Sequence, residues 1–448
     1  MNKKIGLWQA VSIAVGTMIG ASIFSIFGLG ARIAGHNLPL VFIISGALAL
    51  LVAYSYARLG SKIISNAGPM EFILRGLGDG VLTGSLSMLS WLTYVISIAL
   101  FAKGFAGYLL PLIHIEASGL AMGLAQVGVI LLFMGVNLLG SAAVGKAEFV
   151  IVLIKVGVLG VFIILGLWTI HPQWLAPGFS ATQMTGTLYA VAVFFLSYMG
   201  FGLVTNASEN MVDPQRNVPR AIYLSILIVT IIYVAVSAVA VGNLPLPELI
   251  KAEDFALAEA AKPFIGEAGY LLVSIGALFS IASALNATLY GGANIAYALA
   301  KDGELPKIFE RKSWFKAPEG LYITAGLSLA FALGFDLNGI AAITSAVFMV
   351  IYLFVLYSHY RLAPELGGNR PFILFALISV FAVFVVLMIY QWNTNRSAFY
   401  ATWIAFAVSL MVEIIYRGIS RREMVERDIE AVEEALKQRI AHHHGRRR

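Results

Sequence analysis

The chain alternates long apolar stretches with short polar ones from residue 5 to residue 417. Twelve of the apolar stretches approach the length of about 20 residues that a helix needs to cross a bilayer. The third and eighth are long enough to require tilt, and only FDLNG, residues 335–339, separates the ninth from the tenth. The pattern therefore predicts an all-α polytopic membrane protein. The stretches are centred near Gly20, Leu48, Tyr94, Phe133, Gly157, Ser197, Val229, Gly276, Ala330, Val350, Val380 and Ala407.

Composition excludes a soluble protein. The 448 residues are 59% hydrophobic and only 12% charged, whereas about a quarter of a soluble chain is charged. There is no cysteine, so disulfides and thiolate metal sites are excluded. The N-terminal MNKKIGLWQAVSIAVG has the charge and apolar run of a signal peptide but no small-residue cleavage site, and we interpret it as a retained first span.

The basic residues predict the orientation. With the N-terminus inside, 24 of the 30 lysine and arginine residues fall on the inner side. This bias predicts a multi-pass protein of the cell membrane with both termini in the cytoplasm. The net charge of +6 therefore reports on loop placement and does not indicate nucleic acid as a partner. The six remaining basic residues are Arg32, Lys103, Lys155, Lys251, Lys262 and Arg396.

Two spans carry glycines in their middle, where glycine weakens a helix by about 1 kcal/mol relative to alanine. They are GTMIGASIF, residues 16–24, and FFLSYMGFG, residues 194–202, and they lie five spans apart. Such a pair at corresponding places indicates an inverted-repeat transporter with two discontinuous helices. The alternative is close helix packing by small residues, a spacing that Gly16 and Gly20 also fit.

Broken spans expose backbone groups that must face a ligand, because lipid cannot satisfy them. The amino end of a half-helix favours a carboxylate, and free carbonyls favour an ammonium. Two breaks that meet at mid-membrane would therefore suit a zwitterion such as an amino acid.

Four motifs occur in an order that resembles the amino acid–polyamine–organocation superfamily. IGASIF (19–24) and FFLSYMGFG are similar to its first-span and sixth-span motifs, ENMVDPQRNVPRAI (209–222) to the link after span six, and ALAKDGELP (298–306) to the element after span eight. SNAGP (65–69) and FVIVLIKVGVLG (149–160) are similar to the archaeal proton-coupled, broad-specificity members.

This resemblance implies a LeuT-like fold, a core of two inverted five-helix repeats with discontinuous helices 1 and 6. The first repeat is expected at residues 1–170 and the second at 187–360. Two peripheral helices would occupy 371–417. A cytoplasmic tail at 418–448 shows an apolar stripe at helical spacing among its charges. A helix lying on the membrane or the inner loops is the simplest interpretation of the tail, with regulation or dimerisation as the alternative; the oligomeric state is not predicted.

The resemblance also implies a substrate site. The carboxylate would meet the amides of Ala21 and Ser22, and the amine would meet the carbonyl of Met18 and carbonyls of the second break. The superfamily's Ser-Gly pair is Ala21-Ser22 here, and its glutamate after Gly-Phe is Gly202, so recognition of long cationic side chains is not expected. The full set is Thr17, Met18, Gly20, Ala21, Ser22, Leu196, Ser197, Met199 and Gly200.

Lys155 lies near the bilayer midplane. It follows Lys146, at the predicted inner edge, by nine residues, or about 13 Å of helix. A charge at that depth must be paired or lose its proton. In sodium-coupled relatives, by resemblance, a cation bridges spans one, five and eight at this place. The Lys155 ammonium would replace it, with the Gly16 carbonyl and Ser280, or alternatively Ser283, as partners; a fixed structural cation is the alternative.

These features predict a secondary active transporter that couples proton movement to uptake of small neutral L-amino acids, with no cofactor and no sodium. An amino acid exchanger without net proton flow is the first alternative, and a nutrient sensor or channel the second. An enzyme is not expected, because the chain has no HExxH, no GxSxG and no histidine pair within a span.

Overall fold

The computed structural model describes residues 5–138, 144–301, 305–311 and 319–420. Within these ranges the chain is helical and forms no β-strand, apart from an isolated bridge between Ile5 and Met211. The longer helices are α1 (Leu7–Met18), α3 (Phe27–Ala34), α4 (Leu38–Lys62), α5 (Pro69–Leu77), α6 (Val81–Leu112), α7 (Gly119–Leu138), α8 (Val144–Gly166), α9 (Ala181–Phe194), α11 (Pro214–Asn243), α15 (Glu267–Lys301), α16 (Glu319–Gly334), α17 (Leu337–Leu366), α18 (Arg370–Thr394) and α19 (Arg396–Ser420).

Shorter elements connect these helices. The α-helical ones are α2 (Ala21–Phe24), α10 (Leu203–Asn206), α12 (Leu246–Ala252), α13 (Ala256–Glu259) and α14 (Lys262–Ile265). The 3-10 helices are η1 (Gly35–Asn37), η2 (Leu167–Thr169), η3 (Pro172–Leu175), η4 (Phe195–Gly202), η5 (Ser208–Asn210), η6 (Glu253–Phe255) and η7 (Lys307–Phe309).

The membrane architecture predicted from the pattern is confirmed. Ten helical segments of the described residues are long and apolar enough to cross a membrane. Two shorter apolar helices, α1 and α16, correspond to the first and ninth predicted spans. The first is short because the span breaks after Met18. α6 and α15 contain 32 and 35 residues, which at 1.5 Å per residue exceeds a hydrocarbon core of about 30 Å.

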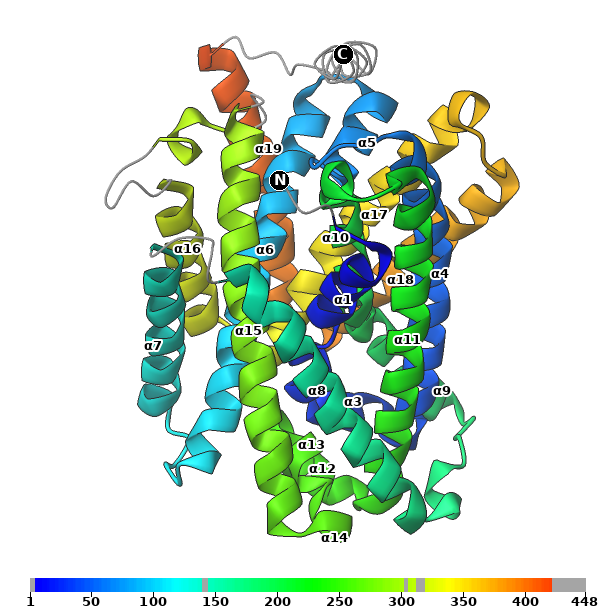
Figure 1. The fold of residues 1–448 in the computed structure, drawn as a ribbon, viewed down its shortest axis with the longest axis vertical. Coiled ribbons are helices and arrows are strands. Elements are labelled where there is room, and N and C mark those ends of the chain that lie inside the picture. The colour runs from blue at the N-terminus through cyan, green and yellow to red at the C-terminus, as the bar shows by residue number, and fades with distance from the viewer. Residues whose placement is uncertain (1–4, 139–143, 302–304, 312–318, 421–448) are drawn as a thin grey trace, which may run out of the picture.

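The long helices run between the two ends of the molecule and enclose the broken first span (Figure 1). α4 packs along α11, and α15 packs along α6. α1 lies in the middle, against α11, η4 and α8. The described chain ends near the top of Figure 1, whereas α12, α13 and α14 gather at the bottom; we call this lower region the α14 end.

The two irregular spans differ in their local structure. The first is interrupted at Ile19 and Gly20, where the helix stops and restarts as α2. The sixth does not open in this way: α9 changes into the eight-residue 3-10 helix η4. A 3-10 run of this length is uncommon, because its hydrogen bonds are poorly aligned. The second break is therefore a change of helix type.

Two of the sequence motifs meet at the upper end of Figure 1 (the loops beside α5 and α10). Asn66 of SNAGP donates its backbone and side-chain NH groups to the Glu209 carboxylate of ENMV, at 2.9 and 3.1 Å. Gly68 has φ +57°, and a side chain there would collide with the Asn206 amide. Glycine is therefore required at position 68 for the two loops to pack this closely.

The predicted division into repeats remains a prediction, and helix bounds depart from its edges. α9 begins at Ala181, before residue 187, and α17 continues to Leu366, past residue 360. α19 extends to Ser420, whereas residues 421–448 of the predicted tail lie outside the described residues.

Candidate functional site

The Met18 carbonyl is the centre of the first break. It accepts hydrogen bonds from the Gly20 amide at 3.0 Å, from the Ser22 hydroxyl at 2.8 Å and from the Tyr233 hydroxyl. Its neighbour, the Ile19 carbonyl, accepts from the Ser280 hydroxyl of α15 at 2.9 Å. Side-chain hydroxyls and a local turn therefore provide hydrogen-bond donors to the two backbone carbonyls that a continuous helix would have paired with its own amides.

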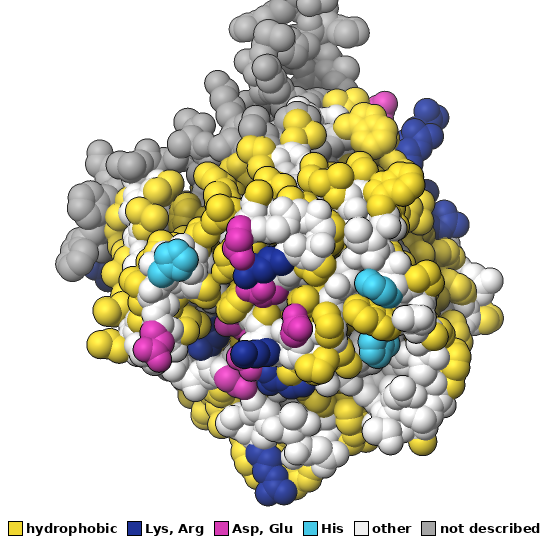
Figure 2. All heavy atoms as spheres, turned by 90° about the horizontal axis from the view of Figure 1, so that it is seen from below, with side chains coloured by type: hydrophobic (Ala, Val, Ile, Leu, Met, Phe, Trp, Pro, Cys, Tyr) yellow, Lys and Arg dark blue, Asp and Glu magenta, His cyan; other side chains and the backbone are white. Residues whose placement is uncertain are grey.

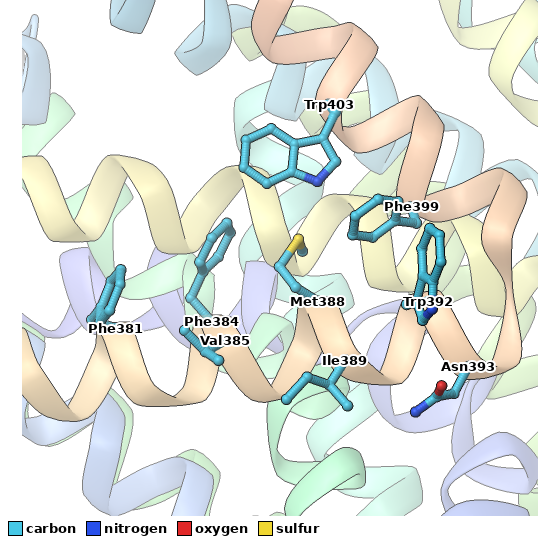
Figure 3. A pocket seen from close by; sticks show the side chains of 9 residues that line it. All are labelled: Phe381, Phe384, Val385, Met388, Ile389, Trp392, Asn393, Phe399 and Trp403. Carbon is cyan, nitrogen blue, oxygen red and sulfur yellow. The ribbon is translucent and has the colours of Figure 1, made fainter.

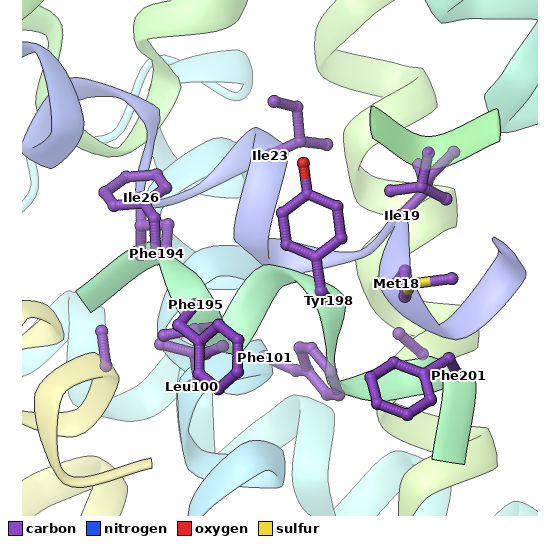
Figure 4. Packing of buried hydrophobic residues seen from close by; sticks show 14 of the residues in the cluster. Met18, Ile19, Ile23, Ile26, Leu100, Phe101, Phe194, Phe195, Tyr198 and Phe201 are labelled. Atoms are coloured by element: carbon purple, nitrogen blue, oxygen red, sulfur yellow. The ribbon is translucent and has the colours of Figure 1, made fainter. Parts of the chain in front are cut away.

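The two breaks touch at Gly200. A methyl group on Gly200 would lie 2.8 Å from the Met18 backbone nitrogen and 3.0 Å from the Ala14 carbonyl oxygen. α1 and η4 can therefore approach backbone to backbone only with glycine at this position. At Gly20 the nearest atom, the Ala284 methyl, would be 3.2 Å away, so this position is less crowded. Figure 4 shows the turn after Met18 lying across the η4 segment around Tyr198.

Tyr233 of α11 joins both breaks and was not predicted. Its hydroxyl contacts the Met18 carbonyl, the Ser22 hydroxyl at 3.1 Å and the Ser197 carbonyl at 3.4 Å, and its side chain is fully buried. A signal was present, because Tyr233 lies four residues from the centre of the seventh span. A phenol at that depth needs a buried partner.

Lys155 connects α8 to the first break. Its ammonium donates a hydrogen bond to the Gly16 carbonyl, and the side chain is 1% exposed. This is the partner that the resemblance implied. The Ser280 hydroxyl donates to Ile19 and retains its acceptor lone pairs, so its contact with Lys155 stays a prediction, as does the alternative at Ser283.

The other predicted substrate-binding residues line the same region. Thr17 returns its hydroxyl to the Ile13 carbonyl at 2.8 Å, within its own helix. Leu196 and Ser197 are buried, and the Ser197 hydroxyl oxygen has no hydrogen-bond partner. The Met199 carbonyl accepts from Tyr352 at 3.5 Å. The Ala21 and Ser22 amides stand at the start of α2, and their role toward a carboxylate remains a prediction.

Aromatic rings close the far side of η4. Phe201 stacks on Tyr352 with ring centres 5.7 Å apart and meets Tyr56 edge-on at 5.2 Å. Phe195 also contacts Tyr352, at 5.7 Å. All of these side chains are buried. These rings form an uncharged, aromatic layer against η4.

A separate groove lies between α18 and α19 and is not part of this site. Figure 3 shows Phe381, Phe384 and Met388 of α18 facing Phe399 and Trp403 of α19. The lining is almost entirely apolar, which fits the lipid-facing surface of a peripheral pair of helices. Within the described residues, no three histidine, aspartate or glutamate side chains gather as a metal site would require.

Irregular backbone at membrane depth, stabilised by buried side chains and facing a second irregular span, is characteristic of membrane transporters. Comparison with known proteins gives the particular family. A family model described as amino acid permease matches residues 5–415, and the chain belongs to this family. It is therefore a multi-pass membrane transporter and not an enzyme, as predicted.

The relatives agree with this assignment. The chain is 59% identical to an uncharacterized protein of Methanocaldococcus jannaschii, MJ0609, over 94% of this chain and 97% of the relative. It is 34% identical to the inner membrane transport protein YbaT of Escherichia coli, over 93% and 97%. It is 28% identical to the methylthioribose transporter of Bacillus subtilis, over 94% of each chain.

Proposed function

We propose that this protein takes up small neutral L-amino acids into the cell by alternating access, driven by protons. Its termini face the cytoplasm, so that the α14 end faces outward, in accord with the basic residues of the sequence. Its two halves act as inverted repeats around the two irregular spans. Amino acid transport follows from the family; the proton, the substrate class and the orientation are the proposal.

The backbone groups of the two breaks bind the carboxylate and the ammonium, which all amino acids share. The amides of Ala21 and Ser22, at the start of α2, receive the carboxylate. The carbonyls of Met18, Leu196, Ser197 and Met199 receive the ammonium. Since backbone groups distinguish no side chain, selectivity is broad.

The side-chain preference follows from the aromatic layer against η4. Phe201 and Tyr352 present apolar surface there. Gly202 offers no carboxylate at the position of the glutamate in the superfamily's sixth-span motif. Among the relatives, the permease BcaP of Bacillus subtilis, 25% identical, is named for branched-chain amino acids. Apolar and small neutral substrates are the class that fits these residues.

The hydrogen bond from Lys155 to Gly16 carries the proton-coupling proposal. A protonated lysine holds α8 to the carbonyl one turn before the break. A neutral amine binds that carbonyl more weakly, because charge-assisted hydrogen bonds are about twice as strong as neutral ones. Proton loss therefore releases α1 from α8. Taking up the proton on one side and releasing it on the other would link the gradient to the movement of the first span.

Uptake in proteoliposomes tests this function. Wild-type protein should accumulate radiolabelled alanine when the outside is made acidic, and Lys155→Gln, which keeps a hydrogen-bond donor, should lose accumulation while retaining counterflow. Lys262→Gln, at a partly exposed lysine of the α14 end that is paired with Glu259 and Glu267, is the control and should accumulate normally. Full accumulation by Lys155→Gln under a proton gradient would refute the coupling role.

A permanently charged Lys155 defines the second candidate, an exchanger without net proton flow. The buried bond to Gly16 also suits a fixed cation that never loses its proton. The two differ in one result: an exchanger shows counterflow but no accumulation under an imposed pH gradient.

A further inference from the structure

Acidic and basic side chains gather on the face of the α14 end. Figure 2 views this face from below and shows them close together in its middle, surrounded by apolar and uncharged surface. Arg32 of α3 forms an ion pair with Glu253 of η6, 221 residues away in the sequence. α3 is the outer continuation of the broken first span. This pair therefore connects the first span, which moves in the proposed mechanism, to the loop between α11 and α15.

The η6 segment, residues 253–255, is wedged between α3 and α6. A side chain on Gly28 of α3 would collide with the Glu253 backbone. A methyl group on Gly107 of α6 would lie 2.5 Å from the Asp254 β-carbon. Two glycines on two helices therefore make room for one short segment, which closes the space between them.

The backbone of the 253–255 segment is strained at Glu253. Glu253 has φ +43°, a region that residues with a side chain rarely occupy. Such conformations cost about 1–3 kcal/mol and persist only when surrounding contacts hold them. The ion pair with Arg32 contributes little of this holding energy, because its two side chains are 50% and 60% exposed. Packing against Gly28 and Gly107 holds the segment closed.

Asp254 is the titratable residue in the middle of the 253–255 segment. Burial, followed by the neighbouring Glu253, raises the pKa of its carboxyl to about 6, against opposing contributions from Lys103 and Arg32. Tyr108 of α6 also faces it and donates its hydroxyl to the Phe24 carbonyl at 2.9 Å. The other charged residues of the helices that contact η6 are Glu248 and Lys251 of α12 and Glu259 of α13.

We propose that Asp254 is a proton-binding residue of an outer gate, so that the 253–255 segment takes up a proton when it closes against α3 and α6 and releases it when it opens. This proposal rests on alternating access, the transport mode proposed above, and is independent of Lys155. The site binds a proton only, and it stands at the predicted outer entrance of the transporter.

The direction of the effect follows from linkage. A carboxyl in open solution has a pKa of about 3.9, and the closed gate raises the Asp254 pKa to about 6. The closed state therefore binds the proton more tightly, and acid stabilises closure. The closed-to-open ratio should rise about tenfold between pH 7 and pH 5, continue to rise to pH 4, and level off only below about pH 3, where the carboxyl of the open state is also protonated.

The absence of cysteine from the chain allows a direct measurement. Ser25 follows Phe24, whose carbonyl accepts from Tyr108, the residue that faces Asp254. Ser25 is fully buried and has an unpartnered hydroxyl, so Ser25→Cys is a conservative reporter next to the gate. An impermeant methanethiosulfonate reagent added outside reaches it only when the gate opens. Ser118→Cys, exposed in the loop after α6, corrects at each pH for the reactivity of the thiol itself.

The corrected labelling rate of Ser25→Cys should fall about tenfold from pH 7 to pH 5. Adding Asp254→Asn, which is neutral at every pH, should make labelling at pH 7 at least as slow as in the parent at pH 5 and remove the pH dependence. Glu248→Gln, at an exposed carboxylate of α12, should leave the profile unchanged.

A flat profile in the parent would overturn the proposal without any substitution at Asp254, as would an Asp254→Asn protein with the parent's pH dependence. Labelling needs neither substrate nor a proton gradient. A failure of proton-coupled accumulation with an intact labelling profile would therefore count against the proposed function and leave the gate standing.

Discussion

The hydroxyl of Tyr233 donates to the Met18 carbonyl, the same group that is proposed to receive the ammonium of the substrate. It also lies 3.4 Å from the Ser197 carbonyl of the second break. One side chain from α11 thus sets the spacing between an acceptor in each irregular span. The substrate would bind where this hydroxyl already holds the two carbonyls in place.

Tyr233→Phe should weaken amino acid binding about 5- to 30-fold, the effect of losing a buried hydrogen bond worth about 1–2 kcal/mol. Isothermal titration calorimetry measures it. Tyr198→Phe is the matched control, because that hydroxyl is also buried but donates to the Phe42 carbonyl of α4 at 2.8 Å. Equal effects of the two substitutions on affinity would show that Tyr233 does not belong to the substrate-binding site.

Gly200→Ala should destabilise the protein, since its methyl group would meet backbone atoms of α1 at 2.8 and 3.0 Å. Overpacking of this kind costs about 1–3 kcal/mol. Gly20→Ala should be tolerated, because its closest contact is another methyl group at 3.2 Å. Thermal unfolding in detergent compares them. A lower Tm for Gly20→Ala than for Gly200→Ala would show that the breaks do not meet at Gly200.

The sequence predicted the features that depend on local chemistry. Mid-span glycines located both irregular spans, and the depth of Lys155 marked it as a buried cation. The change of α9 into a 3-10 helix was beyond reach, because glycine content indicates weakness in a helix and not the form that replaces it. Contacts between distant segments were also beyond reach: nothing in the pattern paired Arg32 with Glu253, and a tyrosine in the seventh span does not name the carbonyls it will bind.

Uptake should be independent of sodium. The Lys155 ammonium already binds the Gly16 carbonyl, and a second cation at that place would meet repulsion from the first. Replacing sodium with choline outside proteoliposomes at constant pH should leave the initial rate of alanine uptake unchanged. Accumulation that follows an imposed sodium gradient would show that the lysine does not occupy the cation's place.

Gly202→Glu should extend the substrate range to cationic amino acids. Gly202 closes η4, and a methyl group there would find its nearest neighbour, a carbon of the Tyr56 ring, at an ordinary 3.5 Å. A side chain can therefore start at this position without displacing the helix. The new carboxylate would enter a region lined by Phe201 and Tyr56, where a charge is costly unless it is paired. A lysine or arginine substrate would supply the partner.

Competition assays should show arginine inhibiting alanine uptake in Gly202→Glu but not in the wild type. Gly202→Gln, of the same shape without the charge, should behave like the wild type. Inhibition by arginine in both variants would attribute the change to size and not to charge.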